Sequence, residues 1–117
     1  MLTLPPAVRL FLCTAPTDMR RGFDGLAQAA QTLLKQDPFS GHLFVFRNRR
    51  GDRVKVLYWD GDGYCLWYKR LEKGVFQLPA RIADGAELRA ADLTMLLDGV
   101  DPTSVRRRAR YRRLPRS

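Results

Sequence analysis

The sequence has few of the residues that hold transition metals or form disulfides. Its 117 residues include two cysteines, Cys13 and Cys65, and one histidine, His42. No Cys-x-x-Cys pair is present, so a zinc site lacks its ligands. Both cysteines lie in apolar, strand-like runs, which indicates small buried core residues in a reducing compartment. We therefore expect no metal, no cofactor and no disulfide.

Long apolar stretches are also lacking. No apolar run approaches the roughly 20 residues that span a bilayer, so no membrane partner is expected. The apolar start of the chain has no charged region before it, which argues against a signal peptide and for a mature chain that begins at Met1. Apolar residues make up 45% of the sequence, which is typical of a globular domain rather than of a disordered chain.

Acidic residues are absent from the last twelve positions, 106–117, which hold seven arginines. This segment supplies most of the net charge of +9, because 14 of the 21 basic and all 12 acidic residues lie before it. Such a tail is typical of an arm that binds phosphate groups or a membrane surface; a solubilising tail is the plainer alternative. Guanidinium groups match phosphate oxygens and base edges, and the tail has no apolar face for lipid, so nucleic acid is favoured. We expect 1–105 to form a single domain and 106–117 a flexible tail. The arginines are Arg106, Arg107, Arg108, Arg110, Arg112, Arg113 and Arg116.

The apolar patterns predict an α+β fold in which an antiparallel β-meander packs with two α-helices. Residues 8–13 predict a first strand, and helical spacing predicts a helix over 23–35, with Thr17 or Asp18 as its N-cap and Asp37-Pro38 as its end. Short turns join the following strands, which must then be antiparallel neighbours. These strands span 42–47, 53–59, 64–71 and 75–78, and a second amphipathic helix follows around 93–100. The predicted order is β-α-β-β-β-β-α.

Two strands of the predicted meander, 53–59 and 64–71, are apolar on both faces. A strand that is covered on one side alone would alternate more cleanly between apolar and polar residues. One face should therefore pack on the first helix. The other face is either covered by the C-terminal helix or used for binding.

The acidic residues suggest two candidate catalytic pairs. Asp60 and Asp62 stand in the sequence DGDG and could begin a metal loop, but no ligand glutamate follows at the required place. Aspartate and glycine are also what a tight hairpin turn requires, and we favour a turn. Asp18 and Asp24 are better explained by the start of a helix, where carboxylates satisfy free N–H groups.

Other catalytic signatures are missing. His42 has no partner pattern for nucleophilic catalysis, and no glycine-rich phosphate loop joins a strand to a helix. Arg20-Arg21 at the start of the first helix could meet a phosphate or could simply be solvated. We therefore expect a protein that is not an enzyme.

A second basic patch lies in the sequence RNRRGDRVK, across one predicted hairpin turn. The tip of a β-ribbon can reach a groove or the backbone of a nucleic acid, although an exposed turn that is basic by chance is an equal alternative. Together with the tail it gives the chain two basic elements, which favours nucleic acid over membrane. The predicted contacts in this patch are Arg47, Arg49, Arg50, Arg53 and Lys55.

Four collinear stretches carry a family resemblance. They are TDMRRGFDGL (17–26), DPFSGHLFVF (37–46), RRGDRVKVLYWDGDG (49–63) and LWYKRLEKGVF (66–76). In these the chain resembles, over about 4–100, the TnpB (Orf-two-like) accessory proteins of insertion-sequence family sixty-six. The resemblance implies a small bacterial protein encoded beside a DDE-type transposase, and it supplies no catalytic residues. Arg89 departs from the Thr or Ser expected before the last helix, which weakens its start, and the tail lies beyond the matching region.

The sequence thus predicts a non-enzymatic accessory protein of DNA transposition and recombination in the bacterial cytoplasm, associated with the nucleoid. DNA and the transposase of the same mobile element are its expected partners, and its oligomeric state is left open. One alternative is a protein–protein adaptor that docks through the aromatic face of the meander without binding DNA itself. A metal-dependent nuclease that uses Asp60 and Asp62 is a further alternative.

Overall fold

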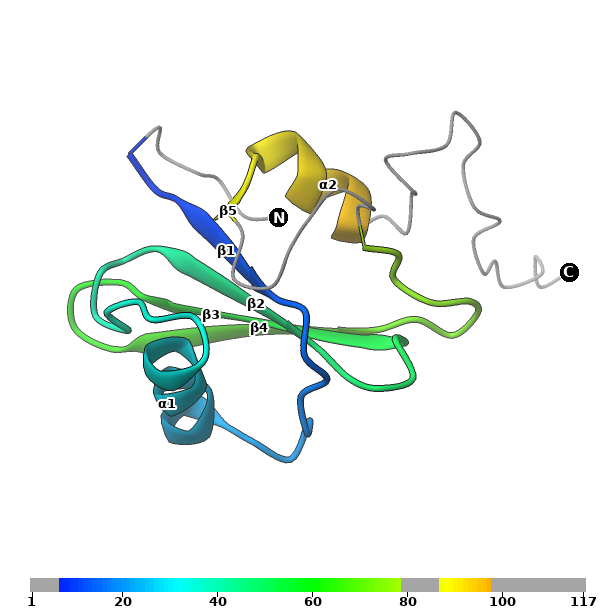
Figure 1. Cartoon of the computed structure of the whole chain (residues 1–117), viewed down its shortest axis with the longest axis horizontal. Coiled ribbons are helices and arrows are strands. Elements are labelled where there is room, and N and C mark those ends of the chain that lie inside the picture. The colour runs from blue at the N-terminus through cyan, green and yellow to red at the C-terminus, as the bar shows by residue number, and fades with distance from the viewer. Residues whose placement is uncertain (1–6, 79–86, 98–117) are drawn as a thin grey trace, which may run out of the picture.

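A mixed five-stranded sheet lies between two helices (Figure 1). The computed structural model describes residues 7–78 and 87–97. The strand order across the sheet is β4-β3-β2-β1-β5. The strands are β1 (Leu10–Cys13), β2 (Leu43–Arg47), β3 (Arg53–Trp59), β4 (Tyr64–Arg70) and β5 (Glu87–Leu88), and the helices are α1 (Phe23–Thr32) and α2 (Ala90–Leu97). The predicted α+β class and the order β-α-β-β-β-β-α are confirmed.

The sheet combines one parallel pair with antiparallel neighbours. β1 runs parallel to β2, with Leu10 opposite Leu43 and Cys13 opposite Phe46, and α1 provides the crossover between them. β2, β3 and β4 form the antiparallel meander that the short turns predict. β1 and β2 lie inside the sheet with both faces covered, which is why their residues are buried and apolar on both sides, except for Arg47 at the end of β2.

α1 covers one face of the sheet. Its small and apolar side chains, among them Leu26 and Ala30, pack on Phe44, Phe46 and Leu57 of the central strands. α1 begins later than Thr17 or Asp18 would place it, with Gly22 as its N-cap. It also ends before Asp37-Pro38, because Lys35 adopts a left-handed backbone (φ 56°) and the N–H of Gln36 bonds to the carbonyl of Ala30 at 3.1 Å.

α2 covers the opposite face (Figure 1). Leu93 and Leu96 join a core that includes Val45 and Val56. Of the two possibilities for this face, a covering helix is therefore the one observed.

The weak start predicted for the last helix, at Arg89, is compensated. The buried carboxylate of Asp92, three residues after Arg89, accepts the Arg89 backbone N–H at 3.2 Å and also contacts the Arg89 side chain. This is the half of a capping box in which the acid at N3 accepts the N–H of the N-cap residue; the half that a Ser or Thr side chain would supply is missing, because Arg89 stands at the N-cap.

The strand predicted over 75–78 is not formed. Phe76 is instead fully buried in the core under α2, and its N–H bonds to the carbonyl of Gly51 at 2.7 Å. The apolar pattern there marks an anchor rather than a strand. The fourth strand after α1 is the short β5, which pairs antiparallel with β1.

Candidate nucleic-acid interface

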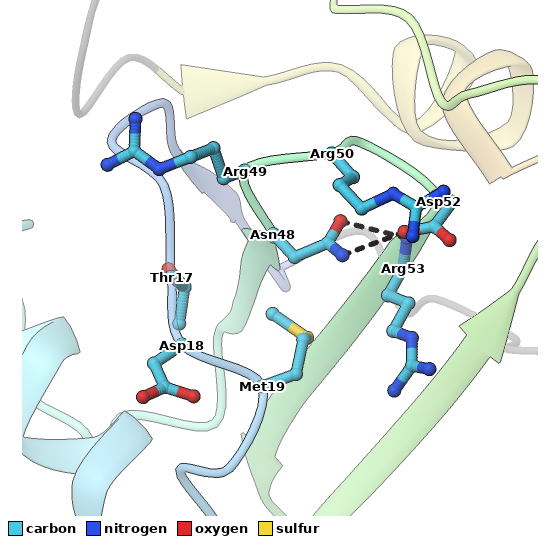
Figure 2. Close-up of a pocket in the computed structure, with 8 residues that line it drawn as sticks. All are labelled: Thr17, Asp18, Met19, Asn48, Arg49, Arg50, Asp52 and Arg53. Carbon is cyan, nitrogen blue, oxygen red and sulfur yellow. Dashed lines mark hydrogen bonds between the residues drawn. The ribbon is translucent and has the colours of Figure 1, made fainter.

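The turn between β2 and β3 is held by the side chain of Asn48. Its Oδ1 accepts hydrogen bonds from the N–H groups of Gly51 (2.9 Å) and Arg53 (3.0 Å), and its Nδ2 donates to Asp52 Oδ1 at 2.8 Å. The two bonds that reach Asp52 and Arg53 are drawn in Figure 2. Gly51 supplies the left-handed backbone (φ 80°) that the turn needs. The result is a turn with a fixed backbone.

Neighbouring segments bind this turn from both sides. The carbonyl of Gly51 accepts from Phe76, and the carbonyl of Asp52 accepts from the N–H of Leu71 at 2.8 Å. At the end of β2, the carbonyl of Arg47 accepts from the N–H of Thr17 at 2.9 Å. The turn is therefore a rigid platform for the arginines it carries.

The arginines of this turn are placed differently from one another. Arg49 and Arg50 are exposed. Arg53 donates through Nη1 to the hydroxyl of Tyr68 at 2.9 Å. Arg47 is half-buried, and its guanidinium packs on Gly51, where burial lowers its pKa. The structure thus brings these four arginines to one end of the sheet and presents Arg49 and Arg50 most openly.

A pocket of about 310 Å³ separates the turn from the segment before α1. Arg49 and Arg53 extend from the turn in different directions, and Asp18 and Met19 belong to the facing wall (Figure 2). The hydrogen-bonded guanidinium of Arg20 lowers the pKa of Asp18 to about 2. The pocket is therefore ionic on both walls. Its lining is Thr17, Asp18, Met19, Asn48, Arg49, Arg50, Asp52 and Arg53.

Lys55 lies away from this surface. It is 6% exposed, and its Nζ donates to the carbonyl oxygens of Met19 (2.7 Å) and Arg21 (2.9 Å). The ammonium also lies 4.8 Å from the centre of the Tyr68 ring. Lys55 thus joins β3 to the segment before α1 and supports the basic turn from inside. Lys55 stands two residues before Leu57, which packs in the core beneath α1, so the two side chains share the covered face of β3.

Asp60 and Asp62 form the predicted turn. Asp60 Oδ1 accepts the N–H of Gly63 at 3.2 Å, Gly61 has a left-handed backbone (φ 106°), and the turn joins β3 to β4. The side-chain hydrogen bond between the two acids lowers the pKa of Asp60 and raises that of Asp62. Within 7–78 and 87–97, no group of three or more His, Cys, Asp or Glu side chains is arranged to hold a metal ion.

The remaining candidates are dispersed. Cys13 is buried and Cys65 half-buried, and neither of these two residues forms a disulfide. His42 Nδ1 accepts the N–H of Arg9 at 3.0 Å, which is a structural contact. The tail arginines Arg106, Arg107, Arg108, Arg110, Arg112 and Arg113 lie outside the described residues. Among the described residues, no helix is long and apolar enough to cross a membrane.

The fold and this turn define a small α+β protein that presents arginines on a rigid hairpin. The chain belongs to the IS66 Orf2-like family, because the family model described as "IS66 Orf2 like protein" matches residues 8–107. The resemblance seen in the sequence is thereby confirmed. Membership supports a role as an accessory protein of transposition.

Two relatives occur in Sinorhizobium fredii. The uncharacterized protein y4hO is 44% identical over 101 residues, which is 86% of this chain and 88% of the relative. The uncharacterized protein y4jC is 40% identical over 102 residues, with 86% of each chain covered. No solved structure matches the chain.

Proposed function

We propose that the protein is a non-enzymatic accessory factor of transposition that binds DNA, and that it acts in the bacterial cytoplasm together with the transposase of its element. The family supports the accessory role. Two basic elements support DNA binding: the turn with Arg49 and Arg50, and the arginine-rich segment 106–116. Arginine binds phosphate oxygens through two parallel N–H groups, and such contacts position a protein on DNA without specifying a sequence.

The observation that carries this proposal is the rigid, exposed pair Arg49 and Arg50. Their turn is closed by Asn48 and anchored by Phe76 and Leu71, so the two guanidinium groups are displayed from a fixed backbone. A preorganised contact loses less conformational entropy on binding than a mobile one. The turn would therefore fix the orientation of the protein on the duplex, while the tail would add affinity.

A salt titration of binding to duplex DNA tests this function. If the seven tail arginines each displace a counterion, the slope of log K against log salt contains a contribution of about −6 from them. Deletion of 106–117 should flatten the slope by that amount. A full-length control with the seven arginines changed to lysine should keep the slope, because the charge is retained. Unchanged affinity and slope in the deletion would refute the role of the tail.

Specificity is tested by the choice of DNA. Binding to the ends of the element and to random duplex, each measured with and without the transposase, separates an end-binding factor from a nonspecific one. Tighter binding to element ends only when the transposase is present would assign the sequence recognition to the complex.

An adaptor function is the second candidate. It is favoured by an aromatic group at the other end of the sheet, in which Phe39 is 58% exposed beside Trp59 and Tyr64. Co-purification with the transposase from a nuclease-treated lysate, combined with no binding to DNA alone, would support the adaptor over the DNA-binding factor.

A further inference from the structure

Three aromatic rings cluster at the β3–β4 turn, opposite the basic turn. Ring centres lie 5.1 Å apart for Phe39 and Trp59, 5.0 Å for Trp59 and Tyr64, and 5.5 Å for Phe39 and Tyr64. Phe39 is 58% exposed, the highest value among the large apolar side chains of the described residues. An exposed aromatic group of this kind, with ordered geometry, is typical of a binding surface.

Exposed carboxylates lie in the segments that pack around these rings. Asp24, Asp37 and Asp62 are exposed, whereas the segments 33–41 and 59–64 contain one basic residue, Lys35. Burial raises the pKa of Tyr64, and the negative charges of Asp37 and Asp24 add to this effect, which places both acids near the ring. We call this set the acidic aromatic surface; it consists of Asp24, Asp37, Phe39, Trp59, Asp62 and Tyr64.

The chemistry of the acidic aromatic surface fits guanidinium groups. A guanidinium stacks on the face of Trp or Tyr and pairs with a carboxylate through its N–H fork. The chain itself contains a matching partner, since 106–116 holds seven arginines and no acid. Charge and ring chemistry are therefore complementary between the surface and this segment.

The segment is also long enough to reach the surface. The carbonyl of Leu97, the last residue of α2, accepts from Lys69 Nζ at 2.9 Å, which places it beside β4 at the edge of the sheet. Tyr64 lies five residues back along β4, a distance of about 17 Å. The nine residues 98–106 can span up to about 30 Å. This leaves enough chain to pass the sheet edge, since packed layers are about 10 Å apart.

We propose that the acidic aromatic surface binds the arginine-rich segment 106–116 of the same chain. In this contact, guanidinium groups stack on Trp59 and Tyr64 and pair with Asp24, Asp37 and Asp62. The contact withholds the arginines from other anions until a stronger polyanion displaces them. It does not depend on the DNA-binding proposal and can be tested without DNA.

The experiment uses fluorescence of Trp59 in the full-length protein. A Trp67→Phe change leaves Trp59 as the single tryptophan, and the seven tail arginines are changed to glutamine so that the surface is free. A synthetic peptide with the sequence of 104–117 is then added at low ionic strength. We expect a saturable change in Trp59 emission. The Trp67→Phe chain with its natural tail should bind the peptide at least about tenfold more weakly. Its own tail competes with the peptide, because a linked segment acts at an effective concentration in the millimolar range.

The matched control neutralises the acids and keeps their turns. Asp37→Asn retains the Oδ1 that accepts the N–H of Phe39 (2.9 Å), and Asp60, which accepts the N–H of Gly63 (3.2 Å), is left unchanged. In the glutamine-tail chain, Asp24→Asn, Asp37→Asn and Asp62→Asn together should weaken peptide binding about tenfold, because three exposed charge pairs are lost.

Three results of the peptide titration would overturn the proposal. These are the absence of saturable binding to the glutamine-tail chain, equal affinity for the chain with the three Asn changes, and equal affinity for the chain with its natural tail. Self-association of the natural chain that the glutamine-tail chain lacks would assign the surface to the tail of a second copy and would also reject the contact within one chain.

Discussion

The ammonium of Lys55 lies 2.7 Å from the carbonyl oxygen of Met19, so a residue of the basic hairpin sequence ties β3 to the segment before α1. This segment, with Thr17 and Asp18, forms the wall of the pocket that faces the basic turn. Lys55 belongs to a basic surface patch in the sequence, but in the fold it is buried and supports that patch from inside.

The Lys55→Met change should destabilise the fold. It leaves the carbonyl oxygens of Met19 and Arg21 without their donor, and such a loss costs about 1–3 kcal/mol in the free energy of unfolding. Urea denaturation measures this value. The matched change at an exposed lysine, Lys73→Met, should alter it by less than about 0.5 kcal/mol. Equal effects of the two changes would contradict the structural role of Lys55.

Gly51→Ala should also destabilise the protein. Its φ of 80° is unfavourable for residues with a Cβ, and the added atom would stand 3.1 Å from Arg47 Nη2. We expect a loss of about 1–2 kcal/mol by thermal or urea unfolding. Gly63→Ala is the control, since nothing lies within 4 Å of its Cβ position and its φ is not left-handed. If alanine is tolerated equally at both positions, the turn is less constrained than its hydrogen bonds indicate.

The Arg49→Gln and Arg50→Gln pair should reduce the salt dependence of DNA binding. Two phosphate contacts contribute about −1.8 to the slope of log K against log salt, so the double variant should be flatter by that amount. Arg9→Gln is the control, because Arg9 pairs with Glu87 at 2.7 Å at the far end of β1. A double variant with the slope of the parent protein would remove the turn from the DNA interface.

Asp18 should titrate at unusually low pH. Its hydrogen bonds to Arg20 lower the pKa from 3.8 to about 2 in the folded protein. A lowered folded-state pKa stabilises the fold above the unfolded-state value, and this contribution is lost as the pH falls from about 4 through 2. Carboxyl chemical shifts followed by NMR against pH should show this midpoint. Arg20→Gln should return it toward the ordinary value, and an unchanged midpoint would assign the shift to another group.

Turn chemistry was the part of the fold most visible in the sequence. Asp60 and Gly61 have few alternatives to a tight turn, and the strand bounds 53–59 follow directly from the two turns around them. The parallel pairing of β1 with β2 was not visible, because it depends on where α1 returns the chain. The two-residue β5 is too short to give a strand pattern. The apolar run at Phe76 predicts a strand that is not formed, since burial there comes from a single anchored ring.

The candidate site was visible only in part. Arg49 and Arg50 could be located because a turn places its residues at the surface. The role of Asn48 could not, since its three hydrogen bonds depend on the folded turn, and a polar residue at such a position has many alternatives. The sequence groups Lys55 with the arginines, because charge alone does not report which face of a strand is covered.

The two turns at the ends of β3 carry charges of opposite sign. β3 spans Arg53–Trp59, so the basic turn and the acidic turn stand about 20 Å apart on one rigid strand (Figure 1). Opposite charges fixed at this separation create an electric dipole along the sheet. Once the arginine-rich segment has left the acidic aromatic surface, this dipole turns the protein in the field of a polyanion so that the end with Arg49 and Arg50 faces it. The fold thereby favours one orientation before any contact is made.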